Sequence, residues 1–146
     1  MIQPVIAIHG GAGAMSRAAM SPEKEQEYLS ALESILAAGQ AVLARGGSAL
    51  DAVTEAVRLL EDCPLFNAGH GAVFTSAGTH ELDAAIMDGA TLRSGAIANV
   101  NCVRNPVFAA RAVMETSKHV FFVGEGAEAF ALSLIHISEP TRPERI

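Results

Sequence analysis

Apolar and polar positions change their spacing several times along the chain. The apolar run PVIAI at 4–8 ends at His9 and a glycine pair, which predicts a buried strand entering a tight loop. A Ser-Pro pair at 21–22 supplies an N-cap and a first-turn proline, and apolar residues then recur at helical spacing up to the glycine pair at 46–47. The pattern therefore predicts a long helix between these two pairs.

The second half of the pattern alternates between helical and strand-like segments. Ser48 and Asp51 form an approximate capping box for a second helix. We expect its inward stripe to consist of Val53, Ala56, Val57 and Leu60. The following segments predict strands at 81–88 and 94–100, a helix from 105, a strand at 119–124 and a helix from 125. This order predicts a layered α/β (α+β) fold.

Composition narrows the class of protein. The chain has 146 residues, half of them hydrophobic and 5% aromatic, which suits one domain with a packed core. A net charge of −6 without a basic stripe argues against nucleic-acid binding. No run reaches membrane-spanning length, and the N-terminus lacks the features of a signal peptide. Two cysteines are too few for a disulfide framework, so we expect reduced thiols and a cytoplasmic location.

Two glycine-rich segments are candidates for chemistry. HGGAG at 9–13 follows the predicted strand, and its backbone N–H groups could face an anion; a phosphate-binding loop and a plain tight turn both remain open. The segment LLEDCPLFNAGHGAVF at 59–74 leaves carbonyls at a helix end without helical partners. Such a loop could hold a hard cation through backbone oxygens, or serve as an ordinary connector.

Other polar groups give weaker signals. Cys63, His70 and His80 do not match the spacing of a zinc site. Glu81, Asp83 and Asp88 could act as paired acid and base, but positions at polar strand ends and in a turn explain them better.

Together these segments resemble a known family. VIAIHGGAGA at 5–14, the stretch from GGSALDAV to NAGHGAVFT at 46–75, HELDAAIMDG at 80–89, GAIANV at 95–100 and NPVFAAR at 105–111 resemble the plant-type L-asparaginases, also called isoaspartyl peptidases or β-aspartyl-peptidases. The resemblance extends in order from residue 4 to Ala131. Residues 1–131 are thus identified as the N-terminal (α-subunit) part of an asparaginase-like domain.

The resemblance implies an N-terminal-nucleophile hydrolase with an αββα sandwich. Such a precursor cuts itself before a threonine, whose hydroxyl then attacks an amide with its own α-amine as base. The implied substrates are L-asparagine and dipeptides with an N-terminal β-aspartyl linkage. The implied partner is the chain's own missing C-terminal β-subunit, and the complete enzyme would be a dimer of αβ heterodimers. Alternatives are an anion- or nucleotide-binding enzyme that uses HGGAG, and a non-catalytic interaction module.

The resemblance also assigns individual positions. Asn67 matches the asparagine that orients the nucleophile, and Gly10 and Gly11 match the loop beside it. No organic cofactor is implied. A structural sodium ion is implied, held by the backbone carbonyls of Leu60, Glu61, Cys63, Phe66, Ala68 and His70.

The nucleophile itself has no match in the chain. Of the threonines, only Thr79 follows a glycine, and it lies in a motif of the precursor's first half. We therefore interpret Thr79 as part of a hairpin turn. Without the catalytic threonine, this chain alone is expected to be inactive.

The last residues differ in their pattern from the rest of the chain. The peptide LSLIHISEPTR at 132–142 can be back-translated into a DNA sequence that resembles the adapter of a transposase-based sequencing library, translated in frame. We interpret residues 132–146 as a non-native tail appended after Ala131.

Overall fold

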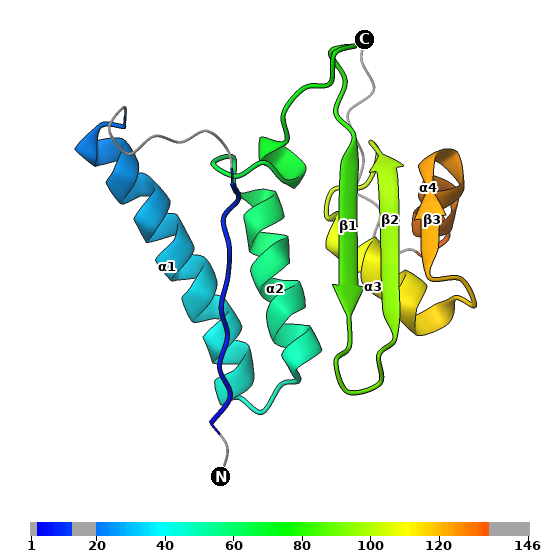
Figure 1. The fold of residues 1–146 in the computed structure, drawn as a ribbon, viewed down its shortest axis with the longest axis horizontal. Helices are drawn as coiled ribbons and strands as arrows, with labels where there is room; N and C mark the ends of the chain where they lie inside the picture. The colour runs from blue at the N-terminus through cyan, green and yellow to red at the C-terminus, as the bar shows by residue number, and fades with distance from the viewer. Residues whose placement is uncertain (1–2, 13–19, 135–146) are drawn as a thin grey trace. The chain divides into compact units, whose positions relative to one another are not determined.

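Figure 1 shows the computed structural model, which describes residues 3–12 and 20–134. The chain forms two compact units, residues 1–71 and residues 72–146. Each unit has its own packed interior, so the two are described separately.

The first unit is a helical hairpin. It contains α1 (Pro22–Ala44), α2 (Ala49–Asp62) and a short 3₁₀ helix, η2 (Gly69–Gly71). The Ser21 hydroxyl accepts the Lys24 N–H at 3.2 Å. Ser48 accepts the Asp51 N–H at 3.1 Å, and the Asp51 carboxylate accepts the Ser48 N–H at 3.2 Å. Both predicted helix starts are confirmed, because local capping groups are present at each.

The strand predicted at 4–8 is wrong. Residues 3–12 are extended but carry no strand pairing in the described structure. Ile6 and Ile8 pack against the helical hairpin, whereas Val5 is 90% exposed. The alternation of a strand is therefore present, but a strand also needs a hydrogen-bonded neighbour, and the described part of this unit supplies none.

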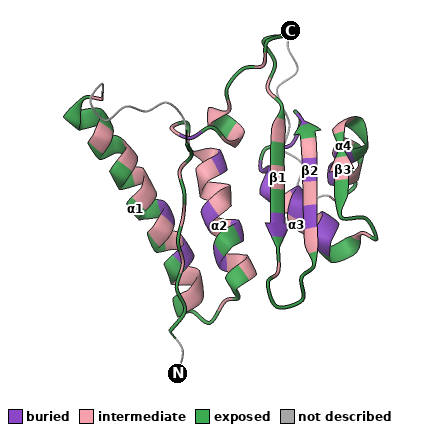
Figure 2. Ribbon diagram, in the orientation of Figure 1, coloured by how far each residue is buried: buried purple, intermediate pink, exposed green. Residues whose placement is uncertain are grey.

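The inward stripe predicted for α2 is only partly correct. Ala56 is buried, but Val53 is 38% exposed, while Ala52 and Thr54 are buried instead. Figure 2 shows buried, intermediate and exposed stretches along α2. The Thr54 hydroxyl can be buried because it donates to the Leu50 carbonyl one turn earlier, at 2.6 Å. Ala56 lies beside α1, since a Cβ at Gly39 would be 3.7 Å from the Ala56 Cβ. Thr54 is two positions from Ala52 and from Ala56, so it lies on a different side of the helix.

The second unit is a three-stranded sheet covered by helices. Its elements are β1 (Leu82–Met87), β2 (Ser94–Val100), α3 (Pro106–Thr116), β3 (Phe121–Val123) and α4 (Gly124–Ser133). The strand order is β1-β2-β3, with β1 antiparallel and β3 parallel to β2. Every strand and helix predicted after residue 80 is confirmed, and α3 lies against one face of β1 and β2 (Figure 1).

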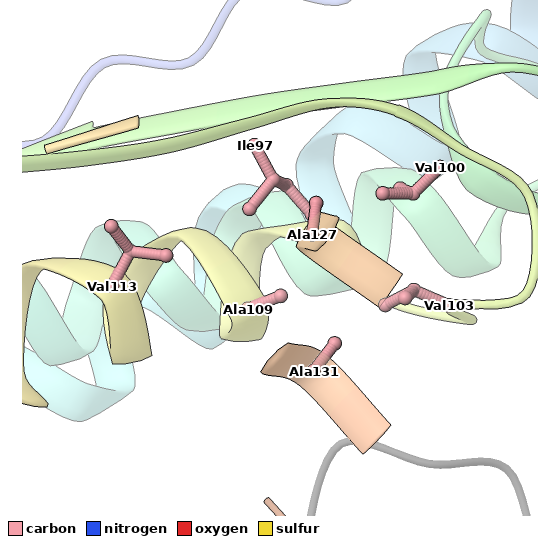
Figure 3. Packing of buried hydrophobic residues seen from close by; sticks show 7 residues of the cluster. All are labelled: Ile97, Val100, Val103, Ala109, Val113, Ala127 and Ala131. Atoms are coloured by element: carbon pink, nitrogen blue, oxygen red, sulfur yellow. The ribbon is translucent and has the colours of Figure 1, made fainter. Parts of the chain in front are cut away.

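The core of the second unit lies between β2, α3 and α4. It is built from small and β-branched residues, shown in Figure 3: Ile97, Val100, Val103, Ala109, Val113, Ala127 and Ala131. Gly95 allows the close approach of helix and sheet, since a Cβ there would overlap the Ala110 carbonyl oxygen and lie 2.9 Å from the Met114 Cβ. Packing density in this core depends on that missing side chain.

The expected α/β class is confirmed. The described residues form a single sheet, and the sandwich is taken up below as a proposal. Within residues 3–12 and 20–134, none of the helices has both the length and the apolar character needed to cross a bilayer. Most of the predicted tail, 135–146, lies outside the described residues, and α4 continues two residues past Ala131 to Ser133.

Candidate functional site

The loop that follows α2 folds into consecutive turns. The Cys63 N–H donates to the Leu60 carbonyl at 3.3 Å, and the Ala68 N–H donates to the Phe66 carbonyl at 2.8 Å. The Gly71 N–H then donates to the Ala68 carbonyl at 3.0 Å. The backbone that follows α2 therefore winds through these turns and returns toward the C-terminal end of the helix.

Two glycines make this return possible. Gly69 has φ +48°, and a Cβ there would overlap the carbonyl oxygen of Glu61. At Gly71 a Cβ would overlap the Phe66 carbonyl oxygen and lie 2.9 Å from that of Pro64. Only glycine permits backbone to approach backbone this closely, so the loop forms a cradle lined by carbonyls.

The carbonyls that the resemblance assigns to a sodium ion can be located in this loop. Of the six predicted ligands, the carbonyl oxygens of Glu61 and Phe66 lie beside Gly69 and Gly71. A carbonyl oxygen has two lone pairs, so those of Leu60, Cys63, Phe66 and Ala68 keep one after accepting a backbone N–H. Hard cations such as sodium prefer oxygen ligands of this type.

The glycine pair after His9 forms the second part of the site. The Gly11 N–H donates to His9 Nδ1 at 3.2 Å, and Gly11 has φ +115°. A Cβ at Gly10 would lie 2.9 Å from Cε1 of Phe66 and 3.3 Å from Cδ2 of Leu32. The structure thus brings Gly10 against Phe66, the residue that precedes Asn67. Gly13, the last residue of HGGAG, lies outside the described residues.

Asn67 is exposed, whereas Phe66 is 4% exposed. A cavity of ≈ 330 Å³ opens beside the two predicted glycines. Its lining consists of Gly10, Gly11, Met20, Glu25, Tyr28, Leu29, Leu32 and Phe66. The predicted Asn67, Gly10 and Gly11 therefore belong to one compact unit and are linked through Phe66.

Two of the candidate carboxylates, Asp83 and Asp88, have structural roles. Asp83 Oδ1 accepts the Asn99 N–H at 2.8 Å, where the strand register shifts and Asn99 has φ +54°. The Asp88 carboxylate accepts the Thr91 hydroxyl at 2.6 Å and the Ala90 N–H at 3.0 Å, and these bonds lower the pKa of Asp88. Because these hydrogen bonds stabilise the charged form of Asp88, its side chain is suited to closing the turn and not to donating a proton.

Thr79 and Cys102 are further polar side chains of the second unit. Thr79 N–H and carbonyl pair with Thr75, and the Gly78 N–H donates to the Thr75 carbonyl at 3.0 Å, which confirms the hairpin turn. Partial burial raises the pKa of the Cys102 thiol, and the Glu128 carboxylate adds to the effect. Within the described ranges, no three His, Cys, Asp or Glu side chains are grouped for a metal ion.

Sequence reasoning missed one contact of the site. It assigned Phe66 a role through its carbonyl only. The ring also matters, since it lies edge-on to Tyr28 with centroids 5.9 Å apart. The helical spacing of Tyr28 and Leu32 marked an apolar face of α1, but spacing alone could not indicate which loop covers that face.

The comparisons with known proteins show the family of the chain. The sequence profile of a family described as asparaginase matches residues 2–142. The chain belongs to the asparaginase family. The matched range runs past Ala131, so it does not mark the boundary predicted for the tail, and that boundary stays a prediction.

Individual relatives strengthen the assignment to the asparaginase family. The chain is 65% identical over 133 residues to an isoaspartyl peptidase of Salmonella typhimurium, which covers 91% of this chain and 42% of the relative. It is 64% identical to an isoaspartyl peptidase of Escherichia coli, with 91% and 41% covered. A plant-type L-asparaginase of Pyrococcus abyssi is 46% identical, with 96% and 45% covered. The resemblance read from the motifs is confirmed, and the chain spans less than half the length of these relatives.

Proposed function

We propose that the full-length protein hydrolyses L-asparagine and removes N-terminal β-aspartyl residues from dipeptides. The observation that carries this proposal is the 65% identity over 133 residues to an isoaspartyl peptidase. The function as a nucleotide-binding enzyme or an interaction module has no support from the comparisons. Free cysteines at 63 and 102 support the proposed cytoplasmic location.

The proposed reaction divides the work between the two parts of the protein. A threonine freed by self-cleavage, located in the part absent from this chain, attacks the side-chain amide of asparagine and releases ammonia. Water then hydrolyses the aspartyl ester to aspartate and regenerates the threonine. In this chain, Asn67 orients the nucleophile, and the Gly10–Gly11 turn lies beside it.

Ammonia release tests this division of work. The full-length gene product is expected to release ammonia from asparagine and aspartate from β-aspartyl dipeptides. Residues 1–131, with or without the tail, are expected to release neither, because no nucleophile is present. Turnover by residues 1–131 alone would contradict the proposal.

The cation proposal concerns folding rather than chemistry. Sodium would be held by the carbonyls of Leu60, Glu61, Cys63, Phe66, Ala68 and His70, and it would fix the loop that carries Asn67. Binding to the native state alone raises the midpoint of thermal unfolding. The full-length protein should therefore unfold at a higher temperature in sodium chloride than in potassium or choline chloride at equal ionic strength. Equal midpoints in the three salts would refute the site.

The sandwich is proposed from an apolar sheet face. The face of the sheet turned away from α3 carries Met87, Phe121 and Val123, each more than half exposed. We infer that a second sheet from the C-terminal part of the protein covers it, since exposed apolar faces of this kind mark interfaces. Residues 1–131 expressed alone should therefore aggregate; a soluble monomer that unfolds cooperatively would contradict this.

The proposed assembly is a dimer of αβ heterodimers. Light scattering on the self-cleaved full-length protein should give twice the mass of the uncut precursor chain. A mass equal to one chain would exclude it.

A further inference from the structure

Phe66 is the point at which the two parts of the site meet. Its backbone belongs to the carbonyl-lined loop: its N–H donates to the Cys63 carbonyl at 3.5 Å, and its carbonyl accepts the Ala68 N–H at 2.8 Å. The same carbonyl oxygen lies beside Gly71, where an added Cβ would overlap it. The backbone that leads into Asn67 is therefore fixed on both sides of Phe66.

The ring of Phe66 is fixed by a different set of neighbours. It contacts Gly10 so closely that a single added carbon would lie 2.9 Å from Cε1. It meets Tyr28 edge-on, with an angle of 71° between the ring planes. With 4% exposure and these contacts, the ring has little freedom to rotate or withdraw.

We propose that Phe66 is a positioning residue for the hydrolytic reaction. Its ring sets the separation between the Gly10–Gly11 turn and the loop of Asn67, two groups that are distant in sequence. This inference rests on the proposed function. The family resemblance gives a role only to the carbonyl of Phe66. The proposal concerns its ring, which joins the loop of Asn67 to the glycine turn through the contact with Gly10.

The competing explanation is that Phe66 only fills the core of the hairpin. Ile35 offers a matched control, because it belongs to the same buried cluster and is 5% exposed, yet neither glycine of the turn is in close contact with it. A pure packing role predicts that Phe66→Leu and Ile35→Ala lower stability and leave turnover by the folded protein unchanged. A positioning role predicts that only Phe66→Leu slows turnover.

The first experiment compares these variants in the full-length gene product with asparagine as substrate. We expect Phe66→Leu to lower kcat by roughly tenfold or more, because small displacements of a positioned group carry large rate penalties. KM should change by less than about twofold, since only interactions specific to the transition state are weakened. Ile35→Ala should keep kcat within about twofold of the parent once corrected for the folded fraction, since it removes no positioned group.

The second experiment tests the contact itself through a double-mutant cycle. Gly10→Ala places a methyl group against Cε1 of Phe66, and Gly10 has no positive φ that would strain an alanine. Leucine lacks the atom that the methyl group meets. Gly10→Ala should therefore reduce kcat and the unfolding temperature less in the Phe66→Leu background than in the parent.

Each outcome is decisive. Parent-like kcat in Phe66→Leu, with the unfolding temperature lowered as in Ile35→Ala, would overturn the positioning role and leave the proposed function intact. Strictly multiplicative effects of Gly10→Ala and Phe66→Leu on kcat would overturn the contact as its basis. A parent that hydrolyses neither asparagine nor β-aspartyl dipeptides would overturn the proposed function, and the positioning role with it.

Discussion

The two compact units of the chain bury their interiors differently. In the second unit, Ile97, Val100, Ala109 and Val113 are at most 1% exposed, and helix lies directly on sheet. In the first unit, the buried cluster is Ile35, Ala56 and Phe66 at 2–5%, surrounded by half-buried side chains. In the unit with the more complete core, the Asp83 and Asp88 carboxylates hold the strand register and a turn. The candidate site lies in the unit with the sparser core.

This difference separates a scaffold from a site. Full burial fixes elements through many apolar contacts, each individually small. The candidate site depends instead on a few specific features: a glycine cradle, a turn with φ +115° at Gly11, and one aromatic ring.

The largest expected effect tests the scaffold. Gly95→Ala would push the sheet off α3, since the new Cβ overlaps the Ala110 carbonyl. We expect a loss of about 2–4 kcal/mol in the free energy of unfolding, because neither backbone can yield cheaply. Urea unfolding of the full-length protein measures this.

Gly89→Ala is the matched control, because a Cβ there meets nothing within 4 Å and Gly89 has no positive φ. It should change the unfolding free energy by less than about 0.5 kcal/mol. Equal effects of the two substitutions would show that the second unit is less tightly packed than described.

A smaller effect is expected from the helical hairpin of the first unit. Ser48→Ala removes the oxygen that accepts the Asp51 N–H and ends the capping box at the start of α2. We expect a loss of about 1 kcal/mol in unfolding free energy. Ser30→Ala, in the interior of α1, should cost less, since its hydroxyl bonds only the Gln26 side chain. If the cost of Ser48→Ala is no greater than that of Ser30→Ala, the cap contributes nothing to the hairpin.

The smallest expected effect concerns charge on α2. Arg58 donates to Glu55 at 2.7 and 2.8 Å and to Asp62 at 2.7 Å, and its hydrogen bond lowers the pKa of Glu55 below 4.5. Because the pKa is lowered in the folded state, the stabilisation is present above the unfolded pKa and lost as pH falls through the folded one. Arg58→Met should cost about 0.5–1 kcal/mol at pH 7, allowing for partial exposure of the pair.

Unfolding measured from pH 7 to pH 3 checks this sign. The difference between Arg58→Met and the parent should shrink below pH 4.5 as Glu55 becomes protonated. Lys24→Met, which removes the more exposed pair with Glu27, serves as the control and should have little effect at either pH. A difference that grows on acidification would contradict the role of Glu55.

The sequence by itself determined what is local. The caps at Ser21 and Ser48, the strand at 94–100 and the turn at Thr75–Thr79 were all predicted correctly, because capping, alternation and turn formation involve residues a few positions apart. The family resemblance was also legible from motifs, since residue types and their spacing are preserved in the sequence itself.

Only the tertiary structure decided which distant groups meet. The alternation at 4–8 predicted a strand, but pairing requires a neighbour, and in the described first unit Ile6 packs on helices instead. The apolar stripe of α2 predicted that Val53 faces inward, but Val53 is exposed and Ala52 is buried. Nothing in the periodicity of the chain could place the ring of Phe66 on Gly10, because contacts between residues far apart in sequence depend on how whole elements pack against one another.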